Sequence, residues 1–301
     1  MILVACSRRK RAPVDATLCA ADLVADSLEA VAAEWRVRLN ASTKKYLPTA
    51  LYGGRSFSEA LSTSKHLGIQ LVVISAGLGV VEPEALAPSY SLTTAGATEE
   101  NVLSRCPPGT KPADWWRAAF QHGTLSRLLQ GSTGRIYLAL PQTYLDMIAD
   151  ELTQLDFQTL DKVRIFTAGE RTLYSSTLRH YVMPYDGRLD GPDSLLPGTK
   201  SDFASRALKH FSGIVSTSEY QMVEYDRTAV ERSLDGMRYP EIARRARKID
   251  AEVQTTLLNA WRALGGNRGR LLRHLRDDMQ IACEQSRFSR LARELEEAGL
   301  V

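Results

Sequence analysis

Short runs of apolar, mostly β-branched residues recur along the first two thirds of the chain, and polar or turn-forming residues bound each run. Such a run is typical of a strand that is buried on both faces of a parallel sheet. The pattern predicts four buried strands and a fifth, more exposed one: Ile2–Cys6, Gln70–Ser75, Arg135–Leu140, Lys162–Phe166 and Tyr181–Met183.

Stretches with apolar residues at helical spacing separate these runs. They predict helices over Asp15–Trp35, Ser56–Leu67, Trp115–Leu129 and Thr143–Leu155. Ser56 is a suitable N-cap for the second helix, and Gly68 is suited to end it. The alternation predicts the α/β class, with a mainly parallel sheet of about four to five strands flanked by helices. Ligands of such sheets bind at the carboxyl ends of the strands, so the loops that follow the strands are the candidates for chemistry.

The chain changes character after residue 215, which predicts an α/β domain over 1–215 and a helical module over 216–301. Beyond Tyr239 nearly all residues are helix formers, with a basic run at 244–248. A glycine pair at 265–266 precedes two predicted helices, Asn267–Asp277 and Cys283–Ala298, an order compatible with a helix-turn-helix unit. From Asp226 onward about 15 basic residues face about 12 acidic ones, which accounts for the net charge of +3 and suits a nucleic-acid-binding module.

Composition limits the class of protein further. Of the 301 residues 44% are apolar and 24% are charged, as in globular domains. No apolar run is long enough to span a bilayer. The four cysteines and five histidines are scattered, without the spacing of a disulfide framework or a zinc site. We therefore expect a cytoplasmic protein with reduced thiols, no metal ion and no membrane partner.

The first candidate segment directly follows the first predicted strand. Ser7, Arg8, Arg9 and Lys10 place a hydroxyl and several cations at the carboxyl end of that strand, where a phosphate group is the natural ligand. If Lys10 is desolvated, its amine is also a candidate nucleophile. A solvated basic turn is the alternative interpretation.

Two further segments follow the second and third strands. Gly77 lets the backbone approach a ligand closely, Glu82 is a candidate catalytic carboxylate at the same edge, and Tyr90 offers a ring for stacking. Gln142 is suited to pair with a base edge and Tyr144 to stack, although an ordinary helix start after a proline explains this position equally well. The glycine pattern is neither a dinucleotide fingerprint nor a Walker A loop, so we expect no nucleotide cofactor.

The loop over 183–202 contains three glycines, an arginine and several carboxylates. A long polar loop inside a compact domain is usually functional. Asp186 is the candidate catalytic carboxylate, with Asp190 and Asp202 in reserve, and Arg188 and Lys200 are candidate ligand-binding cations. Aspartates that only form hydrogen bonds within tight turns are the alternative.

Three blocks of the sequence, Ala5–Lys10, Leu51–Phe57 and Ile74–Pro83, resemble those of a bacterial and phage family with a Cys-Ser-x-x-Lys start and a Ser-Ala-x-x-Gly-Leu block. That family is similar to the peroxide-stress YaaA proteins and the archaeosine-synthase core, and more distantly to uracil-DNA-glycosylase-like folds. The chain also resembles anti-phage DNA glycosylases that remove glucosylated hydroxymethylcytosine. The resemblance covers about residues 1–215, and this chain has Ala76-Gly77-Leu78-Gly79 where a Lys-Tyr-Gly-Leu run is more usual.

The resemblance implies an enzyme that removes a modified base from phage DNA. Such an enzyme extrudes the base and needs a carboxylate to steady the positive charge that develops on the sugar or to activate water. Asp186 would supply that carboxylate, and the cations after the first strand would hold the DNA backbone. Two alternatives stay open: a non-catalytic DNA-binding or stress protein, and an enzyme acting on a modified tRNA base or a free nucleotide.

Overall fold

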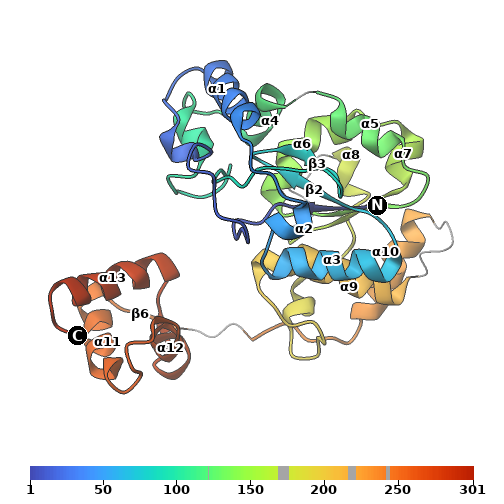
Figure 1. Ribbon diagram of the computed structural model, residues 1–301. Coiled ribbons are helices and arrows are strands. Elements are labelled where there is room, and N and C mark those ends of the chain that lie inside the picture. Colours follow the sequence, from blue (N-terminus) through green and yellow to red (C-terminus); the bar gives the residue numbers. More distant parts are fainter. Residues whose placement is uncertain (121, 169–175, 216–221, 242–244) are drawn as a thin grey trace. The chain divides into compact units, whose positions relative to one another are not determined.

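The computed structural model describes residues 1–120, 122–168, 176–215, 222–241 and 245–301, in two compact units, Met1–Pro240 and Glu241–Val301 (Figure 1). The boundary therefore lies after Pro240 and not after residue 215 as predicted. The reason is helix α10 (Val223–Leu234), whose Val230 and Leu234 are buried in the core of the first unit.

A five-stranded sheet forms the centre of the first unit. Its strands are β1 (Ile2–Ala5), β2 (Leu71–Ser75), β3 (Gly79–Val81), β4 (Ile136–Ala139) and β5 (Val163–Phe166). They lie in the order β3-β2-β1-β4-β5, and all neighbours are parallel except β2 and β3. The predicted α/β class and the four buried strands are confirmed: these strands are shielded on both faces and apolar, apart from the buried Arg164 of β5 and Ser75 at the end of β2.

The fifth strand differs from the prediction. β3 arises from a tight hairpin after β2, whereas Tyr181–Met183 forms only an isolated bridge from Val182 to Ile165 of β5. Two backbone hydrogen bonds hold it there: Ile165 N–H donates to the Tyr181 carbonyl, and Met183 N–H donates to the Ile165 carbonyl. The segment is buried rather than exposed because it covers the outer edge of β5.

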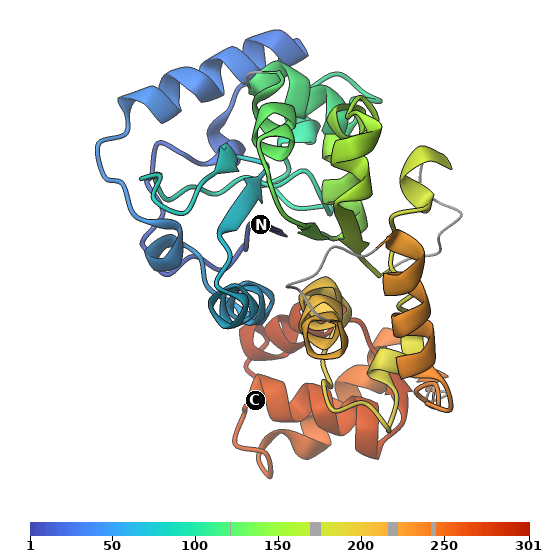
Figure 2. The ribbon, with the colours of Figure 1, turned by 90° about the vertical axis from the view of Figure 1, so that its right-hand side faces the viewer.

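Helices cover both faces of the sheet, as Figures 1 and 2 show. Below the sheet in Figure 1, α3 (Arg55–Leu67) packs against α9 (Phe203–Ile214), with α10 beside them. On the opposite side α4 (Pro112–Ala119) packs against both α1 (Leu28–Ala41) and α6 (Gln142–Thr153). The shorter helices of this unit are α2 (Pro48–Leu51), α5 (Thr124–Gln130), α7 (Phe157–Asp161) and α8 (Ser176–Arg179).

Two predicted helices have different limits in the structure. The first begins at Leu28 rather than Asp15, with Ser27 as its N-cap. Part of the segment before it pairs with another segment instead, since Ser91 N–H donates to the Leu18 carbonyl and Ala20 N–H donates to the Ser91 carbonyl, and Ala20–Asp22 form a 3-10 turn. The helix predicted over 115–129 is divided into α4 and α5, and Gly123 at φ 81° precedes the second one.

Buried ion pairs attach α10 to the sheet. The Asp226 carboxylate is fully buried and accepts from Arg164 Nε of β5 at 2.5 Å and from Arg135 Nη2 at 3.4 Å. Removing one partner of such a group leaves an uncompensated buried charge, which costs about 3–5 kcal/mol. These contacts explain why the first unit extends to Pro240.

The second unit has its own small core. It contains α11 (Asp250–Trp261), α12 (Arg268–Arg273), a π-helical turn (His274–Asp278), α13 (Gln285–Glu297) and the two-residue strands β6 (Ala246–Arg247) and β7 (Ile281–Ala282), which pair in parallel. Leu257, Leu271 and Phe288 are among its buried residues. The last two helices agree with the predicted ones, whereas the short strands were not predicted. The structure describes the basic run at 244–248 only from Arg245 onward. Residues 216–221, at the start of the predicted helical module, lie outside the described ranges.

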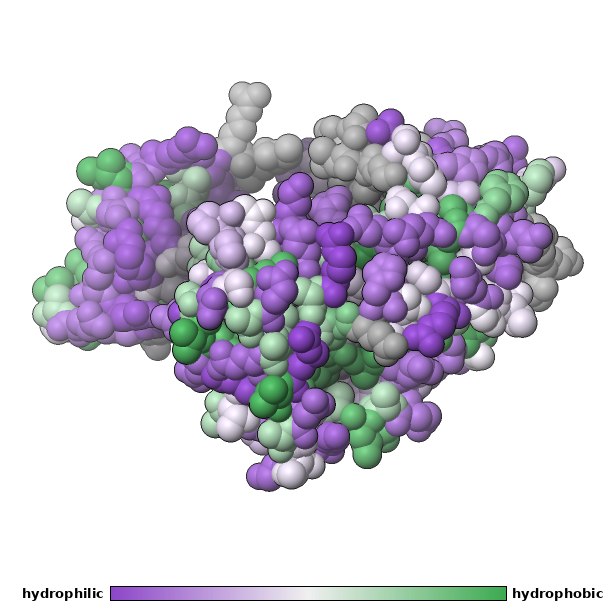
Figure 3. Space-filling model, turned by 90° about the horizontal axis from the view of Figure 1, so that it is seen from above, coloured by the Kyte–Doolittle hydropathy of each residue, from purple (hydrophilic) through white to green (hydrophobic). Residues whose placement is uncertain are grey.

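The surface agrees with the composition. Within the described ranges, no helix has both the length and the apolar character that a membrane crossing demands. Hydrophilic side chains cover most of the face seen in Figure 3, interrupted by smaller hydrophobic groups.

Candidate functional site

The carboxyl ends of three neighbouring strands support a connected group of polar side chains. From β1 the chain moves to β2 on one side and later to β4 on the other, so a topological switch point lies between β1 and β4. Open α/β sheets bind their ligands at such points. Cys6 follows β1 and Tyr144 follows β4 on the first turn of α6, and the Cys6 Sγ and the Tyr144 hydroxyl lie 3.0 Å apart across the switch point.

Ser75, the last residue of β2, joins the strand end to the segments above it. Its Oγ accepts from the Gly77 and Leu78 N–H groups at 3.2 and 3.0 Å and lies 2.6 Å from the Tyr90 hydroxyl. Because a hydroxyl has two lone pairs and one hydrogen, Ser75 donates to the Tyr90 oxygen. Tyr90 in turn lies 3.4 Å from the Tyr52 hydroxyl. Burial raises the pKa of both phenols, so both stay protonated.

Two buried tryptophans fix the hairpin between β2 and β3. The Trp35 Nε1 of α1 donates to the Gly77 carbonyl at 2.7 Å, and the Trp115 Nε1 of α4 donates to the Ala76 carbonyl at 2.8 Å. The hairpin also packs closely on Tyr90, because a Cβ on Gly77 would lie 2.4 Å from the Tyr90 Cε2. Gly77 is therefore required for space.

Lys10 is held between two backbone segments and two aromatic rings. Lys10 forms an antiparallel β-bridge with Tyr52. The adjacent residues continue this pairing, because the Gly53 N–H donates to the Arg9 carbonyl. The Lys10 Nζ donates to the Ser7 carbonyl at 2.6 Å and lies 4.2 Å from the centroid of the Tyr90 ring and 5.2 Å from that of Tyr52. The side chain thus has a defined position above the Ser75–Tyr90 hydrogen bond.

The surroundings of Lys10 shift the pKa of its ammonium group in opposite directions. Burial, the largest effect, lowers the pKa of the Lys10 ammonium, and nearby Arg8 adds to this. Cys6 and Glu100 oppose the shift, and the net direction is downward. The amine is therefore deprotonated more readily than that of an exposed lysine.

A pocket of about 480 Å³ opens beside Lys10. Its polar lining consists of Arg8, Lys10, Arg11, Tyr90, Ser91 and Glu100, and its apolar lining consists of Ala12, Pro13, Val14 and Leu92. The Glu100 carboxylate accepts from Arg8 Nη2 and from the Ser91 hydroxyl, both at 2.8 Å. The volume lies within the range of about 300–1,000 Å³ that is usual for ligand pockets.

Several residues predicted for the site lie in or next to this pocket. Arg8, Lys10 and Tyr90 line it. The Tyr90 ring is almost completely buried and has Lys10 over it, so the structure places an amine where stacking with a base was expected. Ser7 forms a local turn in which its Oγ accepts from the Arg9 N–H at 3.0 Å, and Arg9 is exposed.

The predicted catalytic carboxylates are elsewhere. Glu82 is exposed in the turn after β3, and among the residues described neither Glu82 nor Asp186 lines the pocket. Asp186 accepts from Arg188 Nε at 3.0 Å, from Arg188 Nη2 at 2.9 Å and from the Tyr239 hydroxyl at 3.0 Å. Burial raises the pKa of the Asp186 carboxyl, but these hydrogen bonds outweigh burial and lower it overall. Arg188 also donates to the Leu234 carbonyl at 3.0 Å.

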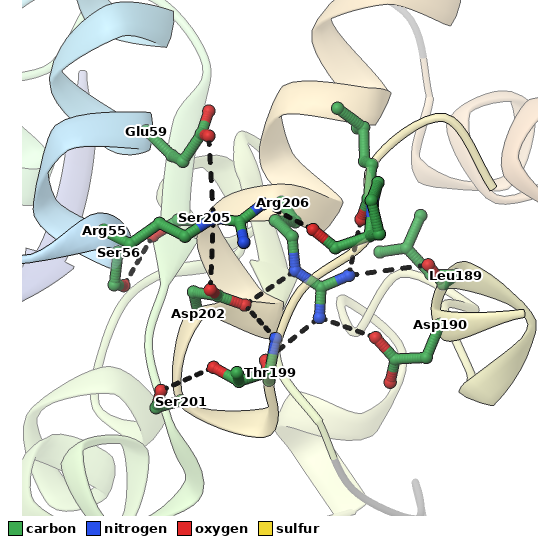
Figure 4. Close-up of polar contacts among 12 residues, drawn as sticks. Arg55, Ser56, Glu59, Leu189, Asp190, Thr199, Ser201, Asp202, Ser205 and Arg206 are labelled. Carbon is green, nitrogen blue, oxygen red and sulfur yellow. Dashed lines mark hydrogen bonds and ion pairs between the residues drawn. The ribbon is translucent and has the colours of Figure 1, made fainter. Parts of the chain in front are cut away.

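Arginines engage the other aspartates of the loop as well. Figure 4 shows the fully buried Arg206 of α9, which donates to Asp202 at 2.7 Å and to Asp190 at 2.6 Å. It also donates to the carbonyls of Leu189, Leu196 and Thr199. Asp193 pairs with Arg238 at 2.6 Å, while Lys200 is exposed. Asp190 and Asp202 thus fix the loop against α9 through Arg206, whereas Asp186 and Asp193 pair with Arg188 and Arg238.

Gln142 begins α6, and its Nε2 donates to Asp146 at 2.6 Å. Three residues that the sequence did not single out belong to the site: Tyr52, Ser75 and Glu100. The first two lie in the blocks that carry the family resemblance. The sequence around Glu100 contains no motif that indicates a site. Glu100 reaches the pocket through backbone pairing, in which the Thr93 N–H donates to the Glu100 carbonyl.

Comparisons with known protein families, curated proteins and solved structures found no match to this chain. Within the described ranges, no group of three or more histidine, cysteine, aspartate or glutamate residues is arranged to hold a metal ion.

Gly77→Ala tests the packing of the hairpin on Tyr90. We expect the free energy of unfolding, measured in urea, to fall by about 1–3 kcal/mol, because the new methyl group overlaps the Tyr90 ring. Gly213→Ala in α9 is the matched control, since nothing lies within 4 Å of its added Cβ. The control should be neutral or stabilising by up to about 1 kcal/mol. Equal stability of the two variants would contradict the packing argument.

Proposed function

We propose that the protein is a DNA glycosylase that hydrolyses the N-glycosidic bond of a modified base in phage DNA, such as glucosylated hydroxymethylcytosine, and so acts in antiviral defence. The observation that supports this most strongly is the pocket at the carboxyl end of β1, which combines Lys10, the carboxylate of Glu100 and the guanidinium of Arg8. The family resemblance of residues 1–215 supports this function independently. On the same resemblance we propose that the sheet has a uracil-DNA-glycosylase-like fold.

The pocket residues suit the steps of base removal. A glycosylase extrudes its target nucleotide and binds it in a closely fitting pocket. Arg8 and Arg11 at the pocket would neutralise the phosphates on either side of the extruded nucleotide. As the N-glycosidic bond breaks, positive charge develops on the sugar, and a carboxylate steadies that charge or orients the attacking water. We assign this role to Glu100 rather than Asp186 because Glu100 lines the pocket; an arginine engages each of the two carboxylates.

The second unit supports a DNA partner. Arg270 and Arg273 of this unit are exposed. Because they lie three residues apart on α12, they share one face of that helix. Among the described residues neither side chain has an ion-pair partner, whereas Arg268 on the same helix pairs with Glu296 at 2.6 Å. Unpaired arginines of this kind suit contacts to a phosphate backbone. We propose that α12 and α13 form the DNA-binding part of a helix-turn-helix unit.

Release of a free base from DNA is the direct test of the enzymatic proposal. Purified protein is incubated with glucosylated phage DNA, unmodified DNA and modified tRNA, and the released base is identified by mass spectrometry. We expect release from the glucosylated DNA and a loss of about 10²–10⁴-fold in rate for Glu100→Gln, the range of a group that acts directly on the reacting atoms. Asp186→Asn serves as the matched control and should retain most of the activity.

The outcomes separate the candidate functions. If no nucleic acid releases a base, the glycosylase proposal is wrong and a non-catalytic DNA-binding role is favoured. Release from RNA alone would favour an enzyme of modified tRNA. A greater loss in Asp186→Asn than in Glu100→Gln would return the catalytic role to the loop over 183–202.

The salt dependence of DNA binding tests the role of α12. Each phosphate contact contributes about 0.9 to the slope of log K against log salt concentration for duplex DNA. We expect the double variant Arg270→Ala, Arg273→Ala to reduce this slope by up to about 2, measured by fluorescence anisotropy over a salt series. Arg268→Ala, which removes an arginine already paired with Glu296, should leave the slope nearly unchanged. A slope that is identical in all three proteins would exclude α12 from the interface.

A further inference from the structure

We propose that Lys10 is the nucleophile of the reaction, and that its Nζ forms a covalent imine with C1′ of the deoxyribose whose base is removed. This inference rests on the proposed glycosylase function and specifies how the sugar carbon is attacked. It assigns to one residue a step that water performs in a simple hydrolysis.

The position of the Lys10 amine is the first reason. It lines the pocket, and both its backbone and its Nζ are fixed, by the bridge to Tyr52 and by the hydrogen bond to the Ser7 carbonyl. A nucleophile gains most when it is held in place before the substrate binds, because the entropy of orientation is already paid. An exposed lysine has a flexible side chain, so its amine is not held in place before the substrate binds.

The surroundings of the amine are the second reason. A lysine attacks only as the neutral amine, and desolvation is the usual way in which proteins activate it. Burial and the neighbouring guanidinium of Arg8 both lower the pKa of Lys10, whereas Cys6 and Glu100 act against them. The tyrosine rings contribute later in the reaction: their faces, 4.2 and 5.2 Å from Nζ, stabilise the cationic iminium once it has formed.

The covalent route is balanced without a further reagent. The Nζ lone pair forms the Nζ–C1′ bond while the bond from C1′ to the base breaks, and the base leaves with that electron pair and takes up a proton released from Nζ. The C1′–O4′ bond then opens, O4′ takes a proton from solvent, and a C1′=Nζ iminium remains. Water adds to C1′ and expels the amine, which leaves an abasic aldehyde and regenerates Lys10. The net reaction is hydrolysis of the N-glycosidic bond.

Borohydride trapping tests the inference on two substrates. The reagent reduces an iminium to a stable amine and so links the protein to the DNA. One arm uses glucosylated DNA and also measures base release, and the other uses a duplex with a preformed abasic site, which can form the imine without any base being removed. The proteins are the wild type, Lys10→Arg and Lys65→Arg, an exposed lysine of α3 that serves as control.

We expect a protein–DNA adduct with both substrates for the wild type and Lys65→Arg, and only background for Lys10→Arg. Peptide mapping of the wild-type adduct by mass spectrometry should place the link at Lys10, which keeps the test valid if Lys10→Arg fails to fold. An adduct mapped to another lysine, or retained in Lys10→Arg, overturns the inference.

The two arms distinguish failure of this inference from failure of the proposed function. Base release without any adduct would mean that water attacks C1′ directly: the inference is then wrong and the glycosylase proposal stands. An adduct at Lys10 on the abasic duplex with no base release from any DNA would support the lysine chemistry and contradict the glycosylase proposal.

Discussion

The hydrogen bond between the Ser75 and Tyr90 hydroxyls, at 2.6 Å, connects the end of β2 to the aromatic ring that contacts the Lys10 amine. Ser75 accepts two amides of the hairpin that follows it, so the hairpin and Tyr90 share one anchor. Tyr90 then supports the Lys10 amine. Because Ser75 and Tyr90 are buried, their hydrogen bond is stronger than it would be in water, and the loss of one partner would leave the other unsatisfied.

Charged residues have two separate uses in the first unit. In the loop over 183–202 the aspartates pair with arginines, as Arg206 does with Asp190 and Asp202, and these pairs hold a polar segment against the core. Around the pocket Glu100 has a cation partner as well, and it differs from the almost equally exposed Asp186 in that it lines the pocket. The same residue types therefore stabilise the fold at one place and line the candidate pocket at another.

The sequence predicted the sheet well because strands that are shielded on both faces are continuously apolar. It singled out Lys10 and Tyr90 because they follow strand ends, where α/β proteins bind ligands, and both line the pocket. It did not predict Glu100, which reaches the pocket only through pairing of the backbone near Thr93. It also predicted a catalytic role for Asp186, and a linear pattern does not reveal that this carboxylate accepts from Arg188 and Tyr239 and, among the residues described, does not line the pocket.

The central claim is that the pocket beside Lys10 receives a base extruded from DNA. A crystal structure of the protein bound to a duplex with a modified nucleotide whose N-glycosidic bond resists cleavage tests this most directly. The account predicts that the extruded nucleotide occupies the pocket, with its C1′ near the Lys10 Nζ and the Glu100 carboxylate. A complex in which every base stays stacked, or in which the extruded base lies in another part of the protein, would contradict it.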